Sequence, residues 1–205
     1  MTRPVLAFAL AVVLAMPPQA QWFSATMPRH QLLQVPAMLV LGAVAAHGSR
    51  RRRPGSAPAW DPAILVLAVG AMMFWMVPRS LDLAASSTVA DQLLHVSWFL
   101  AGAALAHALP RTTLAVTMAL GIHGVAMVAA IGLVYTLYPG LICTAYNMEQ
   151  QRATGHAMLY AAPMLAVVLW GWAVRRMASP VGIPAAAPSS SGEPAPSGGP
   201  LTEAP

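Results

Sequence analysis

Six histidines carry the most versatile chemistry in this chain, and three of them fall close to one predicted membrane surface. His30, His95 and His156 lie at or near the ends of different apolar segments. Imidazole nitrogens bind copper and can ligate haem iron axially, so these residues predict a metal or haem site on that side. The pairs that suit haem are His30 with His156, and His95 with either of them. No Cys-x-x-Cys-His sequence is present, which excludes covalent c-type haem and leaves haem b.

Asp91 precedes His95 by four residues, so the two side chains share one face of a helix. A carboxylate one turn from an imidazole can orient its tautomer and raise its basicity, as it does for metal ligands. A polar helix end with one interhelical hydrogen bond explains the same spacing. Both interpretations stay open at this point.

His123 lies near the middle of an apolar segment, between Gly121 and Gly124. An ionisable residue at this depth is a functional-site hypothesis, and the glycines allow a helix backbone or a flat cofactor to approach. A neutral histidine that bonds to a neighbouring helix is the alternative.

Soft sulfur ligands accompany the histidines, because the chain has 13 methionines and one cysteine. Thioether, thiol and imidazole groups together suit Cu(I), although methionine also fills gaps in apolar cores. The candidate metal ligands are therefore His30, His95, His156, Met27, Met148, Cys143 and Asp91, and the cofactor-binding candidates are His30, His95, His156 and His123. The single cysteine excludes an internal disulfide.

The composition places these residues in a membrane protein. Of the 205 residues, 58% are hydrophobic and only 8% are charged, against about 25% charged in soluble domains. Apolar segments at about 5–19, 30–46, 62–77, 89–109, 112–138 and 156–174 predict an all-α bundle of six membrane helices. Residues 1–177 form the membrane domain, and residues 178–205, rich in Pro, Ala, Ser and Gly, form a disordered cytoplasmic tail.

The first segment is short and ends at Pro17-Pro18, so it is either a cleaved signal sequence or an uncleaved first helix. We favour the uncleaved helix; cleavage leaves five spans in the same orientation.

Arginines set that orientation, since the chain has no lysine. Cytoplasmic segments carry an excess of positive residues. With both termini in the cytoplasm, eight arginines fall inside and three outside. The inner ones are Arg3, Arg50, Arg51, Arg52, Arg53, Arg111, Arg175 and Arg176, and the outer ones are Arg29, Arg79 and Arg152. We expect an inner-membrane location.

Several function classes are absent from the sequence. It has no phosphate-binding loop, no His-Glu-x-x-His zinc helix, no Gly-x-Ser-x-Gly elbow and no aromatic-basic pattern for nucleic acid. We therefore expect no enzymatic activity and no nucleic-acid partner. A small transporter is less favoured, because among the charged and histidine residues His123 alone lies near the midplane.

Residues 27–33, 92–102 and 149–155 together resemble the membrane assembly-factor family of caa3-type cytochrome c oxidases, the CtaG-like proteins. The first stretch resembles the family's histidine-bearing helix start, and the third its acidic-Gln-Gln turn before the last helix. Thr26 stands where the family carries a second histidine, and the second stretch has His95 alone. The resemblance implies an accessory protein that assists copper or haem delivery to a membrane metalloenzyme or oxidase subunit. A structural or partner-binding membrane subunit without cofactor is the alternative.

Overall fold

The computed structural model describes residues 2–47 and 61–178, and within these ranges every regular element is a helix. The predicted all-α class is thereby confirmed. In chain order the helices are α1 (Thr2–Ala15), α2 (Gln19–Ser24), α3 (Met27–Arg29), the π-helical turn η1 (His30–Gln34), α4 (Val35–His47), α5 (Asp61–Met76), α6 (Pro78–Ser86), α7 (Thr88–Ala108), the 3₁₀ turn η2 (Leu109–Arg111), α8 (Leu114–Leu137) and α9 (Met148–Ala178). The four arginines at 50–53 lie outside the described residues. So does the predicted tail at 178–205, apart from Ala178, which ends α9.

Among residues 2–47 and 61–178, three helices are long and apolar enough to cross a membrane, namely α7 extended by η2, α8 and α9. A fourth span is possible if α5 and α6, which meet at a 76° bend, form one broken span. The predicted count of six spans is not confirmed. Helix α1 has 14 residues, about 21 Å of helix against a hydrocarbon core about 30 Å thick. The α3–η1–α4 stretch is divided by its π turn.

The last helix begins earlier than the sequence predicts, at Met148 rather than near His156. The side-chain oxygen of Asn147 accepts from the backbone N–H of Gln150 at 2.8 Å, which satisfies a free amide at the helix start. The connection between α8 and α9 is therefore restricted to residues 138–147.

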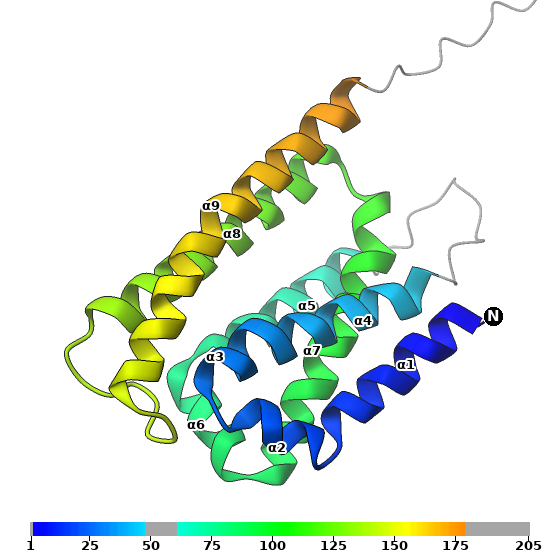
Figure 1. The fold of residues 1–205 in the computed structure, drawn as a ribbon. Coiled ribbons are helices and arrows are strands. Elements are labelled where there is room, and N and C mark those ends of the chain that lie inside the picture. Colours follow the sequence, from blue (N-terminus) through cyan, green and yellow to red (C-terminus); the bar gives the residue numbers. More distant parts are fainter. Residues whose placement is uncertain (1, 48–60, 179–205) are drawn as a thin grey trace, which may run out of the picture.

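Helices α4 and α7 cross in close contact inside a bundle with α1 and α5 (Figure 1). A Cβ added at Gly42 would overlap the backbone carbonyl of Phe99, and one at Gly102 would overlap that of Leu39. Small residues allow helix backbones to approach in this way. The two glycines therefore set the separation of the helices that carry His30 and His95.

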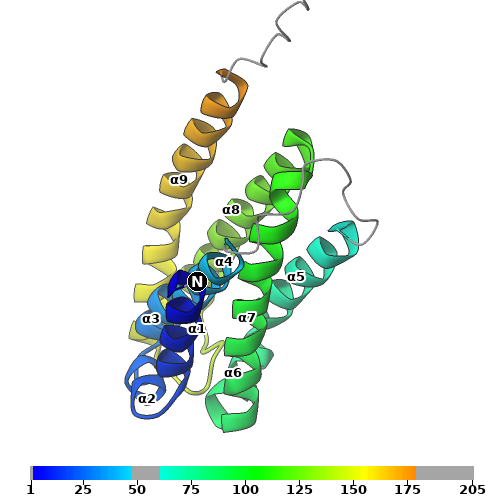
Figure 2. The same cartoon turned by 90° about the vertical axis from the view of Figure 1, so that its right-hand side faces the viewer.

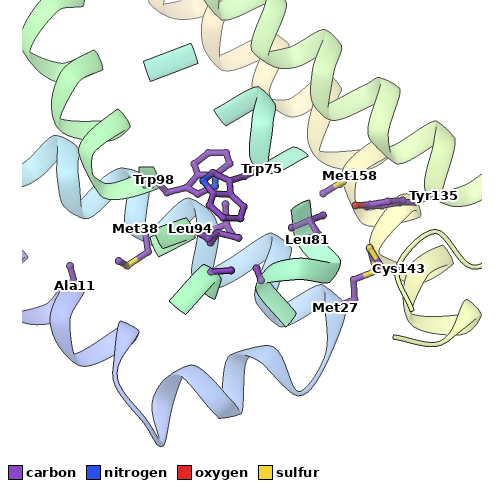
Figure 3. Packing of buried hydrophobic residues seen from close by; sticks show 13 residues of the cluster. Ala11, Met27, Met38, Trp75, Leu81, Leu94, Trp98, Tyr135, Cys143 and Met158 are labelled. Carbon is purple, nitrogen blue, oxygen red and sulfur yellow. The ribbon is translucent and has the colours of Figure 1, made fainter. Parts of the chain in front are cut away.

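Helices α8 and α9 form a hairpin that leans on the bundle mainly at one end (Figure 2). There α9 packs on α3, and the buried core extends from Trp98 and Leu94 of the bundle to Tyr135 and Met158 of the hairpin (Figure 3). This is also the end at which α2, α3 and α6 lie (Figure 1).

The π turn η1 has a local cause in the sequence. Pro36 has no N–H, and its ring would clash with the carbonyl four residues earlier, at Leu32. The backbone widens one turn before the proline, and the N–H of Val35 bonds to the carbonyl of His30, five residues back. Such π turns are rare and frequently occur at functional sites. Here the turn holds His30 and Gln34 inside the bundle.

Candidate metal centre

The packing of α4, which continues η1, against α7 brings three of the predicted ligands together. His30, Asp91 and His95 each offer one ligand atom, and these atoms all lie within 4.8 Å of one another. The two imidazole rings meet edge to face, with centroids 6.1 Å apart and planes at 81°. The group therefore joins residues about sixty positions apart in the chain.

His95 is the most deeply placed member of the group, with 0% of its surface exposed. Among the described residues neither of its ring nitrogens has a hydrogen-bond partner. The nearest carboxylate oxygen, Oδ2 of Asp91, lies 3.5 Å from His95 Nδ1. A buried polar atom without a partner costs about 1–3 kcal/mol. Asp91 is placed to orient the ring or to bind the same ion, as the four-residue spacing predicts.

His30 has a defined hydrogen-bond partner. Its Nδ1 lies 2.9 Å from Oε1 of Gln34, and Gln34 Nε2 donates to the carbonyl of Leu14 at 3.1 Å. Because a carbonyl only accepts, the second bond fixes the amide orientation and makes Oε1 the acceptor for His30. His30 Nδ1 therefore carries the proton, and its Nε2 keeps a free lone pair. Outer hydrogen bonds of this kind orient histidine ligands of metals.

A second glutamine ties the same helix end to α7. Gln92, next to Asp91, donates from Nε2 to the carbonyl of Ala15 at 2.7 Å. The last carbonyls of a helix have no partner within it, and Leu14 and Ala15 end α1. Gln34 and Gln92 thus join α1 to the two elements that carry the candidate ligands.

The remaining predicted ligands lie elsewhere. His156 is exposed on α9, His123 is exposed on α8, and Met148 is half-buried at the start of α9. Neither His156 nor Cys143 belongs to the group of three. Of the predicted haem pairs, His30 with His95 is the one whose rings are in contact among the described residues.

Met27 and Cys143 are both buried in the core, where α3 meets the hairpin (Figure 3). Met27 lies three residues before His30, and its backbone N–H donates to Gln150 Oε1 at 3.3 Å. Burial, and then the negative charge of Asp82, raise the pKa of the Cys143 thiol to about 11. The thiol is therefore protonated at neutral pH, whereas metal ligands are thiolates.

Gln151, near the start of α9, bonds to the loop that joins α8 to α9. Gln151 Oε1 accepts from the N–H of Ile142 at 2.8 Å, and its Nε2 donates to the carbonyl of Gly140 at 3.2 Å. The N–H of Thr144 bonds to Asp82 Oδ1 of α6 at 2.8 Å. The bond between Thr144 and Asp82 connects the hairpin to the bundle.

Sequence reasoning missed Gln34, although a signal was present. His30 and Gln34 are four residues apart, the same spacing that drew attention to Asp91 and His95.

The donor set of two imidazoles and one carboxylate fits a first-row transition metal. Nitrogen and carboxylate ligands bind such ions at about 2.0–2.2 Å, which places ligand atoms roughly 3–4 Å apart. Separations of up to 4.8 Å in the described structure need side-chain adjustments of about 1 Å to reach this range. No protein-family model, curated protein or solved structure matches the chain.

Proposed function

We propose that this multi-pass membrane protein binds a transition-metal ion through His30, His95 and Asp91 and assists metal delivery to a respiratory-type metalloenzyme. The observation that carries the proposal is the state of His95. Both its nitrogens are buried without a hydrogen-bond partner among the described residues, beside a second imidazole and a carboxylate. A bound ion would satisfy one nitrogen and remove the cost of burying it.

Copper is the ion that the resemblance to oxidase assembly factors implies. Nitrogen and oxygen sites bind Cu²⁺ more tightly than the other divalent first-row ions. Met27, which precedes His30 by three residues and is fully buried, is a candidate source of a soft ligand for Cu(I). The resemblance to oxidase assembly factors supports delivery as the role.

Haem b is the second cofactor to test, because two histidines on different helices can ligate iron axially. In the described structure His30 and His95 lie edge to face with centroids 6.1 Å apart, so a macrocycle between them requires the rings to separate and turn.

The competing function is that of a structural or partner-binding subunit. The exposed surface of helix α8 in the hairpin supports it. No residue from 114 to 131 in α8 is buried, and His123 is exposed within this stretch. A histidine in contact with lipid is costly. A neighbouring subunit on α8 would remove that cost without any metal.

An absorption spectrum with elemental analysis of the detergent-purified protein separates these functions. About one copper per chain without a Soret band supports the proposal. A Soret band identifies bis-histidine haem instead. A colourless, metal-free protein that stays empty after incubation with copper salts and with haem contradicts the proposal and supports the structural subunit.

A further inference from the structure

An apolar groove of about 590 Å³ lies outside the metal site. The end of α1 and helix α2 line one side of it, and η1 and α4 line the other. Its walls include Leu14 of α1, Trp22 and Phe23 of α2, and Leu33 and Val40 on the opposite side. Trp22, Leu33 and Val40 are each more than half exposed. The groove therefore opens to the surroundings of the bundle, which for a membrane protein are lipid.

A positive charge lies at the tryptophan end of this groove. The guanidinium carbon of Arg29 lies 4.3 Å from the centroid of the Trp22 ring. In the described part of the chain the arginine–carboxylate pair is Asp61 with Arg111, so Arg29 has no carboxylate partner there. Stacking occupies the face of a guanidinium and leaves its N–H edge free for a phosphate.

The position in the fold suits a lipid headgroup. Helix α2 and the start of α3 lie at the end of the bundle where α7 also begins (Figure 1). Tryptophan is enriched at the membrane–water boundary, where its ring sits at headgroup level. The apolar wall extends from there along α4, away from that boundary.

We propose that this groove binds one anionic glycerophospholipid. An acyl chain lies along the wall formed by Leu33 and Val40. The headgroup phosphate accepts hydrogen bonds from the Arg29 guanidinium, which stacks on the Trp22 ring. The acyl chain of a zwitterionic lipid packs on the same wall. Its headgroup also carries a quaternary ammonium, so the headgroup has no net negative charge to attract Arg29. The site is independent of the metal proposal, since it uses none of the candidate ligands.

Native mass spectrometry of the full-length protein in detergent tests the proposal, with dioleoylphosphatidylglycerol and dioleoylphosphatidylcholine added at equal concentration. We expect the wild type to prefer phosphatidylglycerol about fivefold, the effect of one arginine near an anionic charge. Arg29→Gln should abolish the preference. Arg152→Gln, which removes an exposed arginine on α9, should leave it unchanged.

Trp22→Leu is a second variant, which keeps the groove apolar but removes the ring on which Arg29 stacks. It should weaken the preference for phosphatidylglycerol. Equal binding of the two lipids by the wild type would overturn the proposal, as would a preference that survives Arg29→Gln in a monodisperse protein. Displacement of phosphatidylglycerol by millimolar inorganic phosphate would also overturn it, because the groove then contributes nothing beyond an anion site.

Discussion

His95 and His30 face each other but differ in what their nitrogens contact. His30 donates to Gln34, whereas both nitrogens of His95 are buried without a partner among the described residues. The spacing of Asp91 and His95 could be predicted from the sequence, because it depends on one helix. The approach of His30 could not, since it depends on how α4, which continues η1, packs against α7. His156 was predicted near the same membrane surface as His30, but it is exposed on α9. That outcome also depends on helix packing, which the sequence does not reveal.

Gln34 should matter for metal affinity more than Gln92 does. Gln34→Ala removes the hydrogen bond that fixes the His30 tautomer, and loss of such a partner lowers affinity about 10–100-fold. Gln92→Ala is the matched control, because it also removes a bond to the end of α1 but touches no histidine. Copper titration against a competing chelator measures both, and equal losses would show that Gln34 acts only through α1.

Cys143 should react slowly with alkylating reagents. With its pKa near 11, the thiolate fraction at pH 8 is lower than that of an ordinary thiol with a pKa of about 8.5 by roughly two orders of magnitude. The raised pKa means that the protonated thiol stabilises the fold below about pH 8.5, and this contribution is lost as pH approaches 11.

Iodoacetamide labelling followed by mass spectrometry measures the rate across this pH range. Asp82→Asn should speed labelling at pH 8, because it removes the negative charge that adds to the effect of burial. Glu149→Gln, at the exposed start of α9, should leave the rate unchanged. Labelling of the wild type at the rate of a free thiol would contradict the account of this buried site.

At the scale of elements, the sequence predicted most helices to within a few residues but not their irregularities. The segment 62–77 corresponds to α5 and 112–138 to α8. The π turn before Pro36 and the bend after Met76 were not predicted, because they depend on how a helix relieves a local clash or packs on a neighbour. The π turn matters most for the site, since it contains both His30 and Gln34.

The crossing of α4 and α7 should be sensitive to any side chain at its two glycines. Gly42→Ala or Gly102→Ala places a methyl group on a backbone carbonyl of the other helix, which flexible side chains cannot relieve. We expect a destabilisation of about 1–3 kcal/mol, the range for overpacked cores, and weaker metal binding because His30 and His95 are moved apart.

Gly70→Ala on α5 is the matched control, because an added Cβ there meets nothing within 4 Å. Alanine is the better helix former by up to about 1 kcal/mol, so this variant should be neutral or more stable. Thermal unfolding in detergent compares the three variants. Equal midpoints for Gly42→Ala and Gly70→Ala would contradict the close crossing.

For the whole molecule, the membrane character follows from composition. The structure agrees with it, since its described residues include three or four helices long enough to span. The number of spans was harder to predict, since a short apolar helix and a broken one have the same composition as a full span. Helix α1 illustrates this. Its buried Ala7 and Ala11 lie in a helix that packs on α4, and its last carbonyls accept from Gln34 and Gln92.

These contacts predict that α1 stays attached in the mature protein. Removal of the segment would leave the Gln34 and Gln92 amides without their acceptors. Intact-mass spectrometry of protein purified from membranes should therefore detect residues 2–20. A mature chain that begins near Gln21 would contradict this part of the account.

The most direct test of the central claim is the copper stoichiometry of three purified proteins after loading and dialysis: the wild type, His95→Leu and His156→Leu. Leucine replaces His95 at similar size, so the fold should persist, and the loss of two unpartnered buried nitrogens should leave metal-free stability equal or higher. We expect about one copper per chain in the wild type and in His156→Leu, and none in His95→Leu. Full copper retention by a folded His95→Leu protein would contradict the assignment of the metal centre.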